Sequence, residues 1–251
     1  MEMKKSNGYG RKMPLIAFTL GLGLLGSVAG CSQPVSPSPE NSASASASVG
    51  SNAALPYANG GSVVNNSKGS YIQTTIDDND PAMKYNDSIV SPALKAKYSQ
   101  EKIEQAQQSV VKFIAEQTID STVQGGGTAD EWFSKNNNLI APEFRDDAKK
   151  LIANTKSGFL IDNPSRSGYG LKYGEKDTRV ASRSIEVTKI DLASKERPLI
   201  TANIEYSLKT DSGKLEKASG KVSYAVTEVD GRWLISGYES KVAIVPFEAN
   251  K

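Results

Sequence analysis

The sequence has no histidine and a single cysteine, Cys31, in 251 residues. Without histidine, catalytic triads built on imidazole, imidazole metal sites and proton shuttles that titrate near neutral pH are excluded. One cysteine excludes an intramolecular disulfide and a metal site made of several cysteines. The folded part of the chain must therefore draw its stability from a hydrophobic core, and we predict no metal ion and no cofactor.

The chain also lacks a charge excess of either sign. It carries 30 basic and 28 acidic residues, a formal net charge of +2. Residues 1–30 hold four of the basic and one of the acidic residues, so the remainder has 26 basic against 27 acidic residues, a net charge of −1. Nucleic-acid binding needs a clustered basic excess. We therefore predict no nucleic-acid partner.

The beginning of the chain follows the pattern of an export signal. A basic leader, residues 1–12, precedes an apolar run at residues 14–25. This run is about a dozen residues long, whereas a helix that spans a bilayer needs ~20. Small residues follow and lead into Val28-Ala29-Gly30-Cys31, which resembles the bacterial lipobox. The alternative is an ordinary secretory signal followed by an incidental free cysteine.

The lipobox resemblance implies a lipoprotein. Residues 1–30 would be its signal peptide, cleaved before Cys31, and the Cys31 thiol would carry a diacylglycerol. Two or more acyl chains, such as palmitate, anchor a protein stably without a spanning helix. We therefore predict localisation at the cell membrane, on its extracytoplasmic face, within the cell envelope.

Residues 32–70 are poor in large apolar side chains and rich in Ser, Ala, Pro and Gly. Such a segment buries too little surface to offset its chain entropy. We predict that residues 31–79 comprise the lipidated cysteine and a flexible, disordered linker with a root-mean-square reach of about 35 Å. The globular domain should then comprise residues 80–251.

Helical periodicity dominates the first half of this domain. Ser91-Pro92 favours a helix start, because serine caps well and proline at the first helical position loses no hydrogen bond. The apolar residues that follow share one helical face: Ile103, Ala106, Val110, Phe113 and Ile114. The pattern predicts one amphipathic helix of about 25 residues, ending before the glycines at 125–127. Two shorter helices should follow, one capped by Thr128 with Glu131 and one starting at Pro142.

From about residue 178 the apolar period changes from 3.6 to 2, which indicates strands. Ile185 and Val187 share one face, and Ile190 and Leu192 continue it after a one-residue bulge. The clearest strand alternates five apolar residues with polar ones: Ile200, Ala202, Ile204, Tyr206 and Leu208. Residues 222–226 and 233–235 follow, with short turns at 211–213 and 230–231 that predict antiparallel hairpins. Residues 242–247 could add an edge strand, which Pro246 would confine to a border position.

Helices followed by an antiparallel meander predict an α+β fold. The order of one long helix, two short ones and a sheet whose last hairpin reads Asp230-Gly231-Arg232-Trp233-Leu234-Ile235 resembles the nuclear-transport-factor-2-like superfamily, which includes ketosteroid isomerase and scytalone dehydratase. The resemblance covers roughly residues 90–240. It implies that the N-terminal helices pack on a curved, cone-shaped antiparallel sheet that encloses a pocket.

Enzymes of that superfamily place in this pocket an Asp base with Tyr or protonated Asp donors, or an Asp/His pair. The missing histidine excludes the second version, while a carboxylate with tyrosine stays chemically open. Residues that could line or contact such a pocket are Trp132, Asp162, Tyr169, Tyr173, Tyr206 and Tyr224. Each also has a plain structural interpretation, as a turn, a loop or part of the core. We therefore assign no catalytic residue.

A metal site would need converging carboxylates, and Asp77-Asp78-Asn79-Asp80 is the densest acidic run. It lacks the glycine and the distal glutamate of a calcium loop. The leading hypothesis is a non-enzymatic lipoprotein whose domain is a binding or assembly module for another envelope protein or a small apolar ligand. One alternative is an isomerase or dehydratase that uses Asp and Tyr; another is a lipoprotein that captures ligands.

Overall fold

A computed structural model describes residues 63–66, 69–121, 128–154, 157–160, 178, 180–209 and 215–245. All of them belong to one compact unit, Gly50–Lys251. The lipobox with Cys31, most of the predicted tether and the turn at 211–213 lie outside the described residues. So do three of the candidate pocket residues: Asp162, Tyr169 and Tyr173.

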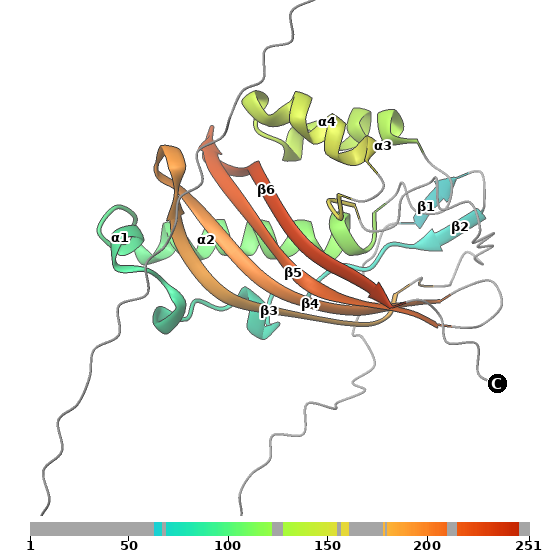
Figure 1. The fold of residues 1–251 in the computed structure, drawn as a ribbon, viewed down its shortest axis with the longest axis horizontal. Coiled ribbons are helices and arrows are strands. Elements are labelled where there is room, and N and C mark those ends of the chain that lie inside the picture. The colour runs from blue at the N-terminus through green and yellow to red at the C-terminus, as the bar shows by residue number, and fades with distance from the viewer. Residues whose placement is uncertain are drawn as a thin grey trace, which may run out of the picture. The chain divides into compact units, whose positions relative to one another are not determined.

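Four antiparallel strands form a curved sheet in the order β3-β4-β5-β6 (Figure 1). They are β3 (Val180–Ala193), β4 (Arg197–Lys209), β5 (Leu215–Val229) and β6 (Arg232–Val245). The predicted two-residue turn joins β5 to β6, with φ of 51° at Asp230 and 73° at Gly231. Positive φ at both central residues matches the right-handed twist of the flanking strands. With the helices described below, this sheet makes the domain α+β, as predicted.

The side-chain alternation inferred from the sequence is confirmed. The apolar face of β4 is buried throughout, from Ile200 to Leu208. The predicted bulge in β3 lies where the pairing shifts between Val187 and Lys189. Residues 242–245 do lie at a border of the sheet, as expected, but they add no further strand: Val242 pairs with Gly220, and β6 continues without a break to Val245.

The predicted long helix is broken. Helix α1 (Pro92–Lys95) starts with Ser91 as its cap, as expected, but it ends after one turn. Helix α2 (Gln100–Phe113) then restarts at Ser99, whose hydroxyl accepts the Lys102 N–H at 3.3 Å. Tyr98, in the break, packs its ring edge-on against Trp233 at 5.8 Å. The break therefore lets a new cap form and an aromatic side chain reach the sheet.

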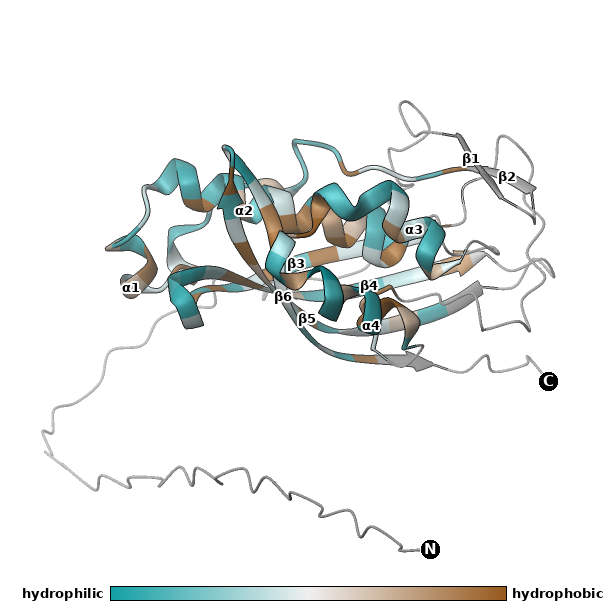
Figure 2. Ribbon diagram, turned by 90° about the horizontal axis from the view of Figure 1, so that it is seen from above, coloured by the Kyte–Doolittle hydropathy of each residue, from teal (hydrophilic) through white to brown (hydrophobic). Residues whose placement is uncertain are grey.

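Helix α2 lies along one face of the sheet (Figure 1) and buries the predicted apolar residues from Ile103 to Phe113. It continues as a π-helical segment, Ile114–Ile119. Helices α3 (Ala129–Asn136) and α4 (Arg145–Ala153) follow. The Thr128 hydroxyl accepts the Glu131 N–H at 3.0 Å, which confirms the predicted cap. Figure 2 shows the outward side of α3 and α4 as mainly hydrophilic.

The packed part of the chain begins before residue 80. Strands β1 (Val63–Asn66) and β2 (Gly69–Ile72) form a short hairpin. Residues 73–84, which we call the strap, then run along α2 and β3. The strap buries Thr74, Ile76 and Met83. Residues 73–76, assigned to the tether from sequence, therefore pack into the domain, whereas residues 77–79 lie exposed on its surface. Two isolated bridges, Ile72 to Thr178 and Val90 to Ile190, join the flanks of the strap to the β3 side.

Within the ranges that the structure describes, no helix has the length and apolarity required to cross a bilayer.

Candidate binding site

Five aromatic side chains pack between α2 and the sheet, where the superfamily resemblance implied a pocket. They come from α2, α3, the segment after α4, β5 and β6: Phe113, Trp132, Phe159, Tyr224 and Tyr238. Ring centroids are 5.3 Å apart for Phe113 and Tyr224, 5.0 Å for Phe159 and Tyr238, and 4.9 Å for the two tyrosines. This aromatic cluster is packed at ordinary contact distances.

The candidate pocket residues that the structure describes, Trp132, Tyr206 and Tyr224, belong to the hydrophobic core of the domain. Tyr206 is 4% exposed and Trp132 is 1% exposed. The Trp132 indole N–H donates to the Gln117 side-chain oxygen at 3.0 Å. The hydroxyl of Tyr224 lies 2.5 Å from that of Thr118, and burial raises the pKa of Tyr224 well above its usual value. The plain structural interpretation of these three residues is therefore the one observed.

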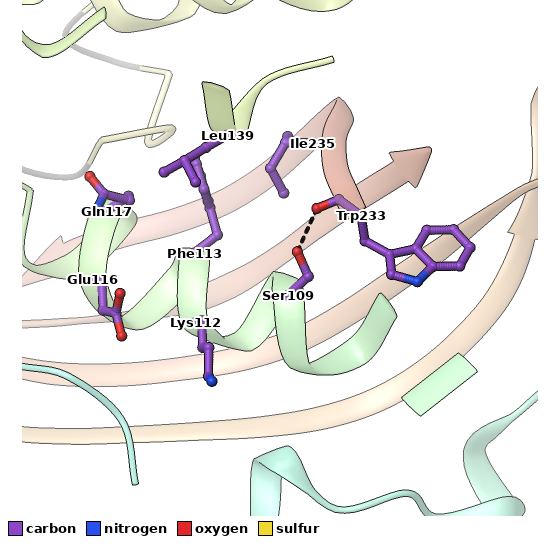
Figure 3. A pocket seen from close by; sticks show the side chains of 8 residues that line it. All are labelled: Ser109, Lys112, Phe113, Glu116, Gln117, Leu139, Trp233 and Ile235. Carbon is purple, nitrogen blue, oxygen red and sulfur yellow. Dashed lines mark hydrogen bonds between the residues drawn. The ribbon is translucent and has the colours of Figure 1, made fainter. Parts of the chain in front are cut away.

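A hollow of about 230 Å³ lies beside α2 and borders the aromatic cluster at Phe113. It is lined by residues of α2, the π-helical segment, the turn after α3 and the start of β6: Ser109, Lys112, Phe113, Glu116, Gln117, Leu139, Trp233 and Ile235. Phe113 and Gln117 point toward the side on which Leu139 and Ile235 lie, whereas the ends of Lys112 and Glu116 point the other way in this view (Figure 3). The hollow is thus apolar on one side and charged on the other.

Local contacts fix the position of this lining. The Ser109 hydroxyl donates to the Trp233 carbonyl at 2.7 Å, which ties α2 to β6 (Figure 3). The Ala141 N–H donates to the Ile235 carbonyl at 2.8 Å, which holds the turn that carries Leu139 against the same strand. Periodicity predicted Phe113, Trp233 and Ile235 as apolar positions. It did not predict Leu139 as a neighbour, because no local signal places the turn after α3 beside β6.

The strap closes the other side of the π-helical segment through polar contacts. One carboxylate oxygen of Asp120 accepts both the Thr74 N–H at 2.6 Å and the Thr74 hydroxyl at 2.8 Å. Arg183 on β3 donates to the Thr75 carbonyl at 2.8 Å. Gln107 on α2 donates to the carbonyls of Ala82 and Lys84 at 2.7 and 2.9 Å. The strap is therefore held by side chains from α2, from Asp120 at the end of the π-helical segment, and from β3. π-Helical segments occur frequently at functional sites.

Glu116 connects the strap and the hollow. Its carboxylate accepts a backbone hydrogen bond from Ile76. Lys112, one turn earlier, forms an ion pair with Asp78 of the strap at 3.1 Å. Burial raises the pKa of the Glu116 carboxyl, and the nearby charges of Lys112 and Arg183 partly oppose this rise. The folded state therefore prefers protonated Glu116 more than the unfolded chain does.

This shift predicts a pH-dependent difference between the wild type and Glu116→Gln. Because the pKa of folded Glu116 lies above its ordinary value, ionised Glu116 opposes folding at neutral pH. That cost disappears as the pH falls through the folded pKa. We expect the glutamine variant to be the more stable near neutral pH, with a gap that closes in acid. Urea unfolding of both proteins from about pH 8 to about pH 4 measures it. A gap independent of pH would contradict the raised pKa.

In the acidic run at residues 77–80, two carboxylates accept hydrogen bonds from nearby backbone N–H groups. Asp77 accepts the Asn79 N–H at 2.7 Å, and Asp80 accepts the Ala82 N–H at 2.9 Å. Among the described residues, no three Asp, Glu, Cys or His side chains converge as a metal site would require. What this region presents is an apolar hollow with a charged rim.

No protein-family model matches this chain, and neither the curated proteins nor the solved structures contain a match to it.

Proposed function

We propose that this protein is a lipoprotein of the cell envelope, anchored at the extracytoplasmic face of the membrane through Cys31. The support is the sequence Val28-Ala29-Gly30-Cys31 behind a basic leader and a short apolar run, with no other cysteine in the chain. The composition of residues 32–62, rich in Ser, Ala, Pro and Gly, suits a spacer between the lipid and the folded domain.

The Cys31→Ser variant tests the anchor. The serine hydroxyl is a far weaker nucleophile than a thiol, so the variant should take up no diacylglycerol and should not be processed as a lipoprotein. We expect loss of metabolic palmitate labelling, and either an unprocessed precursor or release into the medium. Continued labelling of the serine variant would refute lipidation at Cys31.

For the domain we propose a nuclear-transport-factor-2-like module that binds another envelope protein and catalyses no reaction. Helices that precede a curved four-stranded antiparallel sheet, together with the Asp230-Gly231 hairpin and the buried Trp233 and Ile235, support the superfamily assignment.

The aromatic cluster is the observation that carries the binding role. It occupies the space in which a catalytic pocket of that superfamily would lie. The hollow beside α2 then remains as the place where a partner can bind. At about 230 Å³, the hollow is smaller than the ~300–1,000 Å³ typical of small-molecule sites. It suits a single apolar side chain from a partner protein, with Lys112 and Glu116 at the polar rim. Anchor residues of this kind dominate the energetics of many interfaces.

Crosslinking in intact membranes, followed by affinity purification, tests the binding role. Leu139→Lys places a charge in the hollow, and Asn138→Lys places the same charge on the adjacent exposed residue. We expect recovery of the crosslinked partner to fall by about tenfold or more for Leu139→Lys and to stay at the wild-type level for Asn138→Lys. Equal recovery with both variants would remove the hollow from the interface. Capture of lipid without protein would instead favour ligand capture.

A further inference from the structure

Among the described residues, the outer edge of β6 has no backbone partner along most of its length. Strands β3 and β6 form the two borders of the sheet (Figure 1). The β3 border is contacted by Val90 and by the Ser91 N–H. The β6 border is met by Ile140 and Ala141 at Ile235, near its start. From residue 237 to residue 245, no other described segment forms a backbone hydrogen bond with this border.

An open border invites pairing with another strand. Proteins often prevent such pairing with charges of one sign on the edge. Here the exposed edge carries one acid and one base, Glu239 and Lys241, on the same face. Tyr238 and Val242 lie on the opposite face, where Gly158 packs between Ser240 and Tyr238. The five residues from Tyr238 to Val242 therefore read apolar, acid, serine, base, apolar.

This pattern is complementary to itself. If a second copy of the strand pairs antiparallel with the axis at Ser240, Glu239 of each copy lies opposite Lys241 of the other. Tyr238 of each copy then lies opposite Val242 of the other. Opposite charges and aromatic–β-branched pairs at directly opposed positions both stabilise antiparallel strands. A two-fold interface has this property, because the same surface serves both partners.

The cross-strand neighbour of Lys241 within the sheet also favours a glutamate on its outer side. Inside the sheet Lys241 lies directly opposite Lys221 on β5, a like-charge pair that is unfavourable at opposed positions. Both lysines are exposed. Within the described ranges, neither forms an ion pair. A glutamate supplied on the other side of Lys241 would relieve this repulsion.

We propose that two copies of this chain associate through the outer edges of β6, antiparallel about Ser240. The two four-stranded sheets then join into one. The hollow beside α2 is outside this contact, so a copy pair leaves both hollows available.

Charge exchange tests the register. Two full-length copies with different tags are expressed together, the membranes are solubilised, and one tag is purified while the other is quantified. We expect co-purification of wild-type copies. A pair of Glu239→Lys copies, or a pair of Lys241→Glu copies, should be recovered about tenfold less, because each pair opposes like charges at both symmetric positions.

Mixing the two variants supplies the decisive control. A Glu239→Lys copy opposite a Lys241→Glu copy restores opposite charges at both positions, so recovery should return to the wild-type level. The double variant E239K/K241E should likewise pair with itself. Thermal unfolding of each variant confirms that the fold is kept. The proposal is overturned if wild-type copies do not co-purify, or if the mixed pair is recovered no better than each variant with itself.

Discussion

Replacing Trp132 with alanine is expected to lower the free energy of unfolding by about 4 kcal/mol, within the ~3–5 kcal/mol typical of buried Trp or Phe truncations. Trp132 is 1% exposed and lies 6.4 Å, centroid to centroid, from each of Phe113 and Phe159. Its removal leaves a cavity in the aromatic cluster and deprives the Gln117 side-chain oxygen of its donor. Because small domains are stable by ~5–15 kcal/mol in total, the variant should be marginal at 37 °C. Urea unfolding measures the change.

Trp132→Phe separates the contribution of ring packing from that of the hydrogen bond to Gln117. Phenylalanine keeps an aromatic ring in the cluster but removes the indole N–H that Gln117 accepts. We expect this variant to lose about 1–2 kcal/mol, most of it from the unpaired buried oxygen and the smaller ring. If alanine were no worse than phenylalanine at this position, packing in the aromatic cluster would not be a main source of stability.

The sequence predicted the faces of the regular elements well, and for a physical reason. Burial of one face imposes a period on the sequence, so the alternation in β4 and the apolar face of α2 can be identified from the local sequence alone. The caps at Ser91 and Thr128 are also local, because a side chain bonds to a backbone group three residues away. The Asp230-Gly231 turn follows from the positive φ that both residues must adopt.

What the sequence did not predict depends on contacts between distant residues. The break at Ser99 replaces a continuous helix because Tyr98 finds a partner in Trp233, far along the chain. The first part of the strap, residues 73–79, was predicted to be tether because its few apolar residues show no period. Its place in the core depends on partners such as Asp120, 46 residues from Thr74. The hollow could not be predicted either, since Leu139 and Ile235 meet only through the tertiary fold.

Asp120 holds the strap to the rest of the domain through Thr74. Asp120→Ala is therefore the second substitution for which we expect a large effect. Asp120 is fully buried, and it accepts two hydrogen bonds from Thr74 at 2.6 and 2.8 Å. In Asp120→Ala both donors lose this acceptor in a site without room for bulk water. We expect a loss of about 3 kcal/mol, since a buried donor left unpaired costs ~1–3 kcal/mol and bonds to charged groups are the strong ones.

A local readout separates release of the strap from general destabilisation. Thr74→Val removes only the hydroxyl bond and keeps the N–H bond, so it should cost about 1 kcal/mol. Hydrogen exchange of the strap amides, including that of Ile76, should accelerate far more in Asp120→Ala than in Thr74→Val, while exchange in β4 and β5 stays slow. Unchanged exchange at Ile76 in Asp120→Ala would show that the apolar contacts of the strap hold it without the carboxylate.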